Sequence, residues 1–205
     1  MKNNLNIEIS NISVVIPNWN GAKTLENVIK SCINQTLKPL EILICDDGST
    51  DNSKEVVDQI NNDLVKWIPL PHFGTPAIPR NNGIKISKGE WIAFCDSDDE
   101  WFPEKLEKQI KKAYETKCKA VCTNATRKVN GINIIGNMIN YKKEKIFFND
   151  LLNSNSIVCS SSMIHKSVLE RVGGFSETIE YGSYADFICW LRIATQTNFA
   201  FINEP

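Results

Sequence analysis

Short apolar runs alternate with amphipathic segments through the first half of the chain. Residues 12–16 and 41–45 are apolar runs rich in β-branched side chains, which predicts two strands. Between them Leu25, Val28 and Ile29 recur at helical spacing, which predicts a helix. The chain therefore begins with the order strand, loop, helix, strand.

The same alternation continues after the second strand. Further strands are predicted at residues 66–70, 91–95 and 120–123. Pro79 and Pro103 each stand where the first turn of an intervening helix is expected. Nearly continuous apolar strands separated by helices favour a mostly parallel sheet with helices on both faces, because right-handed crossovers place the helices there. We therefore expect an α/β fold.

The second half is less regular. Asn130-Gly131 predicts the turn of a β-hairpin, and residues 149–156 form a polar stretch. An amphipathic helix that carries Phe187 and Trp190 on one face precedes a last apolar run at residues 199–202. The chain then ends abruptly, which is compatible with a truncated C-terminal side.

Size and charge limit the classes of protein that fit. The chain has 205 residues, 42% of them hydrophobic and 23% charged, which suits one globular domain with a continuous core. Lys and Arg number 23 against 24 Asp and Glu, so the formal net charge is −1. Nucleic acid is therefore not an expected partner.

The cysteines and the N-terminus point to a reducing compartment. Seven cysteines lie mostly in apolar segments without a Cys-x-x-Cys pair, and two histidines could not complete a zinc site with them. We expect buried, reduced thiols. Residues 1–8 are polar, and no run of about 18 apolar residues occurs, so a cytoplasmic location is expected.

Polar clusters follow four predicted strands at the point where each strand ends. They lie at residues 18–20, 46–48 and 96–99, with Arg80 after the third strand. Because the carboxyl ends of parallel strands meet at one edge of a sheet, we expect these clusters to converge there. Grouped carboxylates repel one another unless a cation joins them, and Mg²⁺ or Mn²⁺ would be completed by diphosphate oxygens and water.

Four motifs occur in a characteristic order: SVVIPNWN at residues 13–20, DDGSTD at 46–51, DSD at 96–98 and GGF at 173–175. In these motifs the chain resembles family 2 glycosyltransferases of GT-A fold. The resemblance implies a Rossmann-like three-layer α/β/α domain with a mostly parallel central sheet and a smaller acceptor-side sub-region.

The resemblance also implies a division of the single domain and an activity. Residues 1–123 would form the nucleotide-binding half, and residues 124–205 the acceptor-side half. The implied reaction is metal-dependent, inverting transfer of a sugar from a nucleotide-diphosphate donor, expected to be a UDP-sugar, to an acceptor hydroxyl. Relatives that modify surface polysaccharides at the cytoplasmic membrane face imply peripheral membrane association here as well.

Particular residues take roles by the same resemblance. The implied nucleotide-binding positions are Pro17, Trp19, Asn20, Asp47, Arg80 and Asp96. Asp98, together with Asp96, would hold Mn²⁺ or Mg²⁺. Asp186 would be the catalytic base that takes the proton of the acceptor hydroxyl. Family members commonly carry an acidic pair at this point, and Ala185 replaces its first member.

Each of these residues also has a structural interpretation. Asp47 could belong to an ordinary polar turn before the next helix, and Arg80 could be a surface ion-pair partner. Asp186 would be favoured at a helix start by the unsatisfied N–H groups there. His72 and His165 have no evident catalytic partners and are expected to be ordinary hydrogen-bonded histidines.

Two other functions remain open at this point. A haloacid-dehalogenase-like phosphohydrolase also places Asp-x-Asp after a parallel strand, but its motif normally lies near the start of the core, whereas several predicted strand–helix units precede Asp96. A non-catalytic nucleotide-sugar-binding module would account for Ala185 in place of an acid.

Overall fold

A computed structural model of the protein describes residues 11–129, 132–133, 136–178 and 184–205. The strands are β1 Ile12–Asn18, β2 Glu41–Asp47, β3 Val65–Leu70, β4 Trp91–Phe94, β5 Ala120–Thr123, β6 Lys128–Val129, β7 Ile132–Asn133, β8 Lys145–Ile146, β9 Ser162–His165 and β10 Phe199–Ile202. The helices are α1 Leu25–Ile33, α2 Ser53–Ile60, α3 Ala77–Ile86, α4 Lys105–Thr116, α5 Phe148–Asn153, α6 Lys166–Val172 and α7 Ala185–Ala194, and a 3₁₀ turn, η1, spans Cys159–Ser161.

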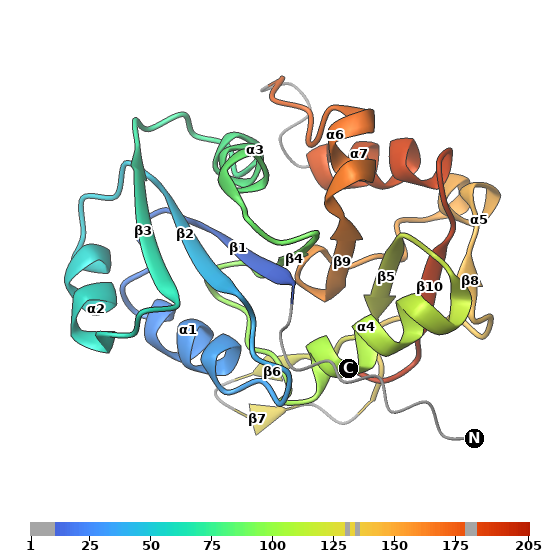
Figure 1. The fold of residues 1–205 in the computed structure, drawn as a ribbon, viewed down its shortest axis with the longest axis horizontal. Helices are drawn as coiled ribbons and strands as arrows, with labels where there is room; N and C mark the ends of the chain where they lie inside the picture. Colours follow the sequence, from blue (N-terminus) through green and yellow to red (C-terminus); the bar gives the residue numbers. More distant parts are fainter. Residues whose placement is uncertain (1–10, 130–131, 134–135, 179–183) are drawn as a thin grey trace.

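One eight-stranded sheet in the order β3-β2-β1-β4-β9-β5-β10-β8 forms the centre of the fold, with helices on both faces (Figure 1). The first four strands in this order run parallel. Every residue of β1 is buried, because α1 packs on one face of the strand and α3 on the other. A Cβ on Gly83 of α3 would lie 2.4 Å from Val15 Cγ1, so this helix approaches β1 as closely as a glycine allows.

The other half of the sheet is mixed. β9 is antiparallel to both β4 and β5, whereas β10 runs parallel to β5 and antiparallel to the edge strand β8. Side chains of this half alternate between an apolar cluster under α7 and another under α4. Trp190 of α7 is fully buried among Phe94, Phe175 and Phe199, which anchors that helix to the sheet.

The elements predicted for the first half are confirmed, each with small shifts at its ends. The final helix and the last strand are confirmed as α7 and β10, and all seven cysteines are buried and free. β6 and β7 form the expected antiparallel pair, although the Asn130-Gly131 turn lies outside the described residues. The strands β8 and β9 and the helices α5 and α6 were not expected, and most of α5 falls within the stretch at residues 149–156 that looked simply polar.

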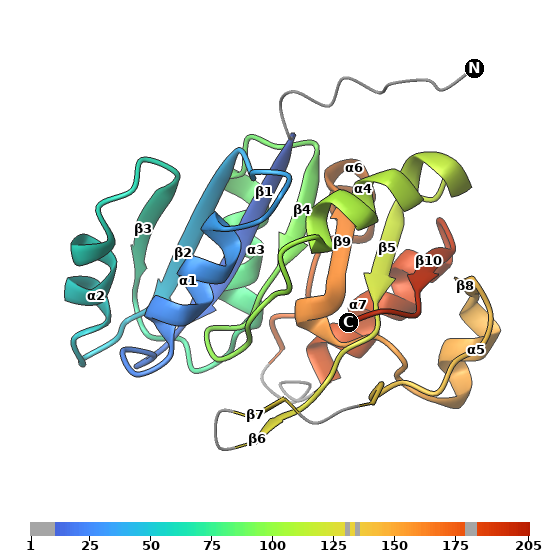
Figure 2. The same cartoon turned by 90° about the horizontal axis from the view of Figure 1, so that it is seen from below.

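The carboxyl ends of β1, β2 and β4 lie on one side of the molecule, the lower side in Figure 2, and the β6–β7 hairpin extends from that side. The loops that follow these strands therefore meet along one edge, as the parallel topology predicts. Among the described residues, no helix combines the length and the apolar character that spanning a bilayer would require.

Candidate functional site

Two asparagines fasten the loop after β1 to the loop after β2. Asn18 Nδ2 donates a hydrogen bond of 2.8 Å to Asp46 Oδ1. Asn20 adopts a left-handed conformation with φ of 52°, and its Oδ1 accepts a 2.8 Å hydrogen bond from the Thr50 backbone N–H. The nucleotide-binding role implied for Asn20 stays a prediction, because these contacts explain its geometry without a ligand.

Asp47 holds the loop that follows β3. Its carboxylate accepts hydrogen bonds from the backbone N–H groups of Phe73, at 2.8 Å, and Gly74, at 2.9 Å. The loop can approach this closely because a Cβ on Gly48 would lie 2.8 Å from the backbone nitrogen of His72. Asp47 is 4% exposed, so the turn-stabilising interpretation accounts for its contacts, and its role towards a nucleobase stays a prediction.

Trp19 presents an aromatic face at the end of β1. The indole is 57% exposed, and it stacks on the imidazole of His72 with ring centroids 5.0 Å apart and an angle of 20° between the ring planes. Pro17 is buried in β1 just before it. The exposed indole offers a face on which a planar ligand could stack.

Arg80 is buried, so the interpretation of this residue as a surface ion-pair partner is wrong. It is 5% exposed, its Nη2 donates to Asp96 Oδ1 at 2.5 Å, and its guanidinium carbon lies 5.3 Å from the ring centroid of Phe175. Burial alone would lower the pKa of Arg80, but Cys159, Asp96 and Asp186 outweigh it and raise the pKa above its usual value. The guanidinium is therefore firmly charged.

The GGF motif supports Arg80 through the next residue of α3. Asn81 Oδ1 accepts a hydrogen bond from Phe175 N, and Asn81 Nδ2 donates to Phe175 O, each at 2.9 Å. Gly174 has φ of +66°, and a Cβ there would lie 2.4 Å from Asn81 Oδ1. The two-glycine turn thus lets Phe175 lie against Arg80. Sequence reasoning missed Asn81. The available signal was that Asn81 directly follows Arg80 in the chain.

The acidic loop after β4 is held from two sides. The Asp96 backbone N–H donates to Ser160 Oγ at 2.9 Å, and Thr24 Oγ1 donates to the Ser97 carbonyl at 2.6 Å. Trp101 Nε1 donates to the Ser160 carbonyl at 2.8 Å, which ties the end of the loop to η1. Ser160 is a second residue that sequence reasoning missed, because nothing in its neighbours along the chain relates it to Asp96.

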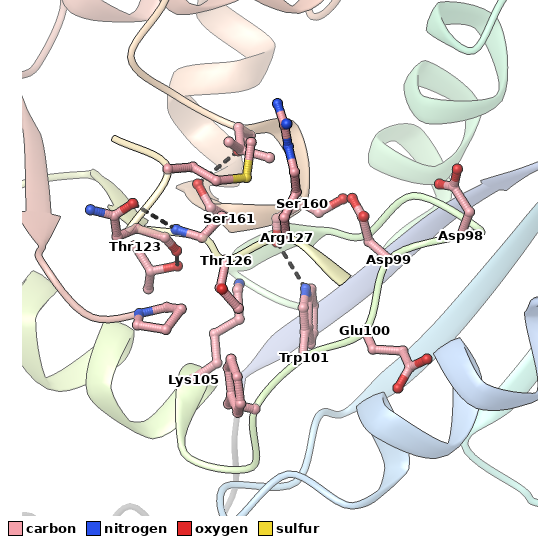
Figure 3. Close-up of a pocket in the computed structure, with 16 residues that line it drawn as sticks. Asp98, Asp99, Glu100, Trp101, Lys105, Thr123, Thr126, Arg127, Ser160 and Ser161 are labelled. Atoms are coloured by element: carbon pink, nitrogen blue, oxygen red, sulfur yellow. Dashed lines mark hydrogen bonds between the residues drawn. The ribbon is translucent and has the colours of Figure 1, made fainter. Parts of the chain in front are cut away.

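A cavity of about 540 Å³ adjoins the acidic loop. Residues from the loop after β4, the end of β5 and η1 line it. Figure 3 shows Asp98 on one side of this cavity and Thr123 on the other, with Lys105 and Trp101 between them and Trp101 hydrogen-bonded to η1. Burial raises the pKa of Asp99, and the nearby carboxylates of Asp96 and Asp98 raise it further.

The described residues contain no group of three or more His, Cys, Asp or Glu side chains arranged to hold a metal ion. Asp96 is occupied by Arg80, whereas Asp98 is exposed and makes no ion pair within the described part of the chain. Mg²⁺ needs as little as one protein carboxylate when phosphate oxygens and water complete its shell. The donor set therefore fits an ion that arrives with a diphosphate.

Asp186 lies in the first turn of α7, on the side of the sheet that carries Arg80. Its Oδ1 accepts a 2.6 Å hydrogen bond from Phe187 N, a helix-start contact of the kind expected. Its charge also raises the pKa of Arg80, which places it in the same electrostatic environment as Asp96. Ala185 is buried in the apolar cluster, so an acid at that position would enter the core.

An α/β/α domain with acidic loops at the ends of β2 and β4, and with Arg80 paired to the second of them, has the features of a GT-A glycosyltransferase. A profile of the family described as Glycosyl transferase family 2 matches residues 13–173. The chain therefore belongs to glycosyl transferase family 2 and is an enzyme of that class. Family membership rules against the phosphohydrolase and binding-module alternatives.

Relatives and solved structures agree with this assignment. Over 192 residues the chain is 29% identical to the UDP-Glc:alpha-D-GlcNAc-diphosphoundecaprenol beta-1,3-glucosyltransferase WfgD of Escherichia coli, covering 94% of this chain and 73% of that protein. S. aureus TarS 1–349 in complex with UDP superposes with a TM-score of 0.78 at 24% identity, covering 95% of this chain and 58% of that chain. The mannosyltransferase PcManGT from Pyrobaculum calidifontis in complex with GDP-Man and Mn²⁺ gives a TM-score of 0.71 at 19% identity, covering 96% and 55%. The chain thus spans little more than half the length of these two structures, which establish the fold alone.

Proposed function

We propose that this chain transfers a sugar, with inversion and with the help of a divalent cation, from a UDP-sugar to the hydroxyl of a saccharide acceptor. The buried Arg80–Asp96 ion pair carries this proposal, because it joins α3 to the acidic loop, and the charge of Asp186, the candidate base on α7, raises the pKa of the same guanidinium. The UDP-glucose donor for which WfgD is named and the UDP bound to TarS support UDP as the nucleotide.

The nucleotide half of the donor would lie over the loops after β1 and β2. Trp19 offers the exposed aromatic face for the nucleobase, with Pro17, Asn20 and Asp47 shaping the loops around it. Arg80 would contribute its positive charge near the ribose and diphosphate. Its Nε makes no hydrogen bond within the described residues, so one buried donor is free for a ligand oxygen.

Asp98, supported by Asp96, would hold Mn²⁺ or Mg²⁺. When bound, such an ion supplies positive charge that stabilises the departing nucleoside diphosphate. The chain's own contribution is to keep Asp98 accessible while Arg80 holds Asp96 and Ser160 holds the backbone of the same loop. The loop is therefore preorganised at one end and open at the other.

Asp186 would act as the base for a direct displacement. In inverting transfer the acceptor oxygen attacks the anomeric carbon, the bond from that carbon to the diphosphate oxygen breaks, and the acceptor proton passes to a carboxylate. The charge of Asp186 raises the pKa of Arg80, so the candidate base and the guanidinium interact electrostatically.

The acceptor side would be the cavity next to the acidic loop, since residues of the acceptor-side half, between Asn124 and Pro205, form part of its lining. WfgD is named for a lipid-linked acceptor, a GlcNAc-diphosphoundecaprenol. By analogy we propose a saccharide of a surface-polysaccharide pathway as the acceptor class, with the enzyme working at the cytoplasmic face of the membrane.

Calorimetric titration with UDP tests the proposal directly. The protein is expected to bind UDP in the presence of Mn²⁺ or Mg²⁺, and binding should weaken strongly when the cation is chelated. If UDP and GDP both fail to bind with either ion, the proposed nucleotide-sugar activity is contradicted.

A further inference from the structure

Lys105 places a buried positive charge at the wall of the cavity beside the acidic loop. It belongs to the first turn of α4 and is 5% exposed. Figure 3 shows its side chain extending from α4 toward Thr126, with Trp101 beside it. The ammonium group therefore lies where a ligand inside the cavity would meet it.

The protein leaves this ammonium group incompletely bonded. Of its three N–H groups, one donates a 2.8 Å hydrogen bond to Gln109 Oε1, and the ring centroid of Trp101 lies 4.0 Å from Nζ. Among the described residues, the ion pairs of α4 lysines involve Lys108 and Lys112, and none involves Lys105. Burial lowers the pKa of Lys105 to about 8, so the charged form still predominates at pH 7. A buried cation without a counter-ion has a desolvation cost that a bound anion would offset.

The charges that line the cavity are separated by sign. The carboxylates, Asp98, Asp99 and Glu100, are consecutive in the loop after β4. The positively charged residues, Lys105 and the exposed Arg127, come instead from α4 and from the segment after β5. In the view of Figure 3 the ring of Trp101 stands between the Lys105 and Glu100 side chains. A ligand that extends across the cavity would thus meet carboxylates at one end and cations at the other.

We propose that Lys105 binds an anionic group of the acceptor, a phosphate or a carboxylate, inside this cavity. The inference rests on the proposed function, in which this cavity is the acceptor side. An oxygen of the anion would accept an N–H that the protein leaves unused, in a charge-assisted hydrogen bond. A phosphate would come from a lipid-linked acceptor, and a carboxylate from a uronic acid unit of a saccharide.

The group bound at Lys105 is distinct from the reacting groups. Arg80, which is proposed to meet the donor diphosphate, and Asp186, the candidate base, are not part of the described cavity lining. Asp98, the proposed ligand of the cation, does line the cavity. The cavity therefore opens next to the cation site, and its Lys105 end would hold a part of the acceptor that lies beyond the attacking hydroxyl.

The variants for the test change one charge at a time. Lys105→Met removes the ammonium group and keeps the length of the side chain. Lys111→Met is the matched control, because Lys111 is exposed on the same helix and does not line this cavity. Lys105→Gln also removes the charge but keeps an N–H donor, and it replaces the Met variant if that protein does not fold. Thermal midpoints of all variants establish folding.

Three probes built on one sugar separate charge from sugar binding: α-glucosyl phosphate, glucuronate and neutral methyl glucoside. Each is titrated by ligand-observed NMR into protein loaded with UDP and Mg²⁺. One anionic probe should bind at least about tenfold more tightly than methyl glucoside to the unaltered and Lys111→Met proteins. In Lys105→Met this advantage should fall to about twofold or less, whereas a purely structural role would change all three affinities alike. Preference for the phosphate or for the carboxylate identifies the source of the anion.

The outcomes also separate this inference from the proposed function. If UDP binds but the unaltered protein does not prefer either anion, or if the preference persists without the Lys105 charge, the anion site is overturned. If UDP does not bind, the proposed function fails, and the same titrations without nucleotide test the site alone. A preference that is then lost in Lys105→Met supports an anion site, and no preference overturns it.

Discussion

Lys105, which lines the cavity, shows how one residue can oppose the stability of the fold. Its side chain is 5% exposed, its ammonium lies 4.0 Å from the ring centroid of Trp101, and it donates a 2.8 Å hydrogen bond to Gln109 Oε1. Burial lowers the pKa of Lys105 to about 8. A buried cation with a single hydrogen-bond acceptor and one aromatic face is incompletely solvated.

Replacement of Lys105 by Met should therefore stabilise the protein at pH 7, by up to about 3 kcal/mol, since one pKa unit corresponds to about 1.4 kcal/mol. Between pH 8 and about 10 the folded state loses this proton while the unfolded chain keeps it, so the unaltered protein should gain stability relative to the variant as pH rises. Urea unfolding of both proteins at pH 7, 8, 9 and 10 measures the difference between their free energies of unfolding. Both proteins carry the same cysteines, so the titration of the thiols cancels in this difference. A variant less stable than the unaltered protein at pH 7 would mean that the ammonium makes a net stabilising contribution.

Asp186 gives a residue-scale prediction about catalysis. Asp186→Asn keeps the shape and the helix-start contact but removes the base, so the transfer rate should fall by about 10² to 10⁴-fold while UDP affinity is retained. Asp58→Asn, in an exposed ion pair of α2, is the matched control and should leave both quantities unchanged. Rate retention in the Asp186 variant, measured with a panel of UDP-sugars, would exclude this residue as the base.

At the scale of elements, the site depends on how α3 is joined to the segment after α6. Asn81 makes two hydrogen bonds to the backbone of Phe175, and Phe175 in turn lies against Arg80. The segment reaches this position through consecutive left-handed glycines, Gly173 and Gly174. A conformational requirement in one turn thus determines the environment of a charged side chain on another element.

Replacing each glycine of this turn by alanine separates the cost of backbone strain from that of losing the clasp, by which we mean the two hydrogen bonds between Asn81 and the backbone of Phe175. Gly173→Ala meets open space, so it should cost about 1–2 kcal/mol of left-handed strain. Gly174→Ala would also displace Asn81 Oδ1, which a new Cβ would meet at 2.4 Å, and should cost about 1–2 kcal/mol more through the lost hydrogen bonds.

Chemical denaturation and UDP titration of the two alanine variants provide the measurement. We expect Gly174→Ala to weaken UDP binding and Gly173→Ala to leave it nearly unchanged, because the first disturbs the support of Arg80. Equal losses of stability and binding in both variants would argue that the clasp contributes nothing to the site.

For the whole molecule, the site is shared between the two halves of the sheet. Trp19, Asp47 and Arg80 come from the parallel half, whereas Asp186 and Ser160 come from elements that pack on the mixed half. The antiparallel pairing of β9 with both β4 and β5 joins these halves. A ligand that contacts both sides should therefore stabilise the folded state as a unit.

This sharing predicts a thermal shift that requires nucleotide and metal together. At a UDP concentration about 100 times the dissociation constant the folded state should gain about 2.7 kcal/mol. The shift should be largest with UDP and Mn²⁺ or Mg²⁺ and should shrink when EDTA is added or when Asp98 is replaced by Asn. A UDP shift of equal size without any cation, measured by scanning calorimetry, would contradict the role of Asp98 in holding the ion.

Much of the fold could be predicted because it is encoded locally. The apolar runs of β1, β2 and β4 and the helical spacing in α1 and α4 identify these elements without knowledge of their neighbours. β8 has only two residues, too few to display a period, and β9, with the sequence SMIH, has only two apolar residues in succession, so neither strand stands out as an apolar run. Their pairing depends on the strands that flank them in the sheet.

The amino-acid sequence by itself determined the order of strands and helices in the first half of the chain, the acidic loops at the strand ends and the family, because periodicity and short motifs depend on residues close together in the chain. The tertiary structure alone decided that Arg80 is buried against Asp96, that Asn81 clasps Phe175 and that His72, rather than Asp47, is exposed beside Trp19. These contacts join residues far apart in the chain, and their formation depends on how the whole sheet and its helices pack.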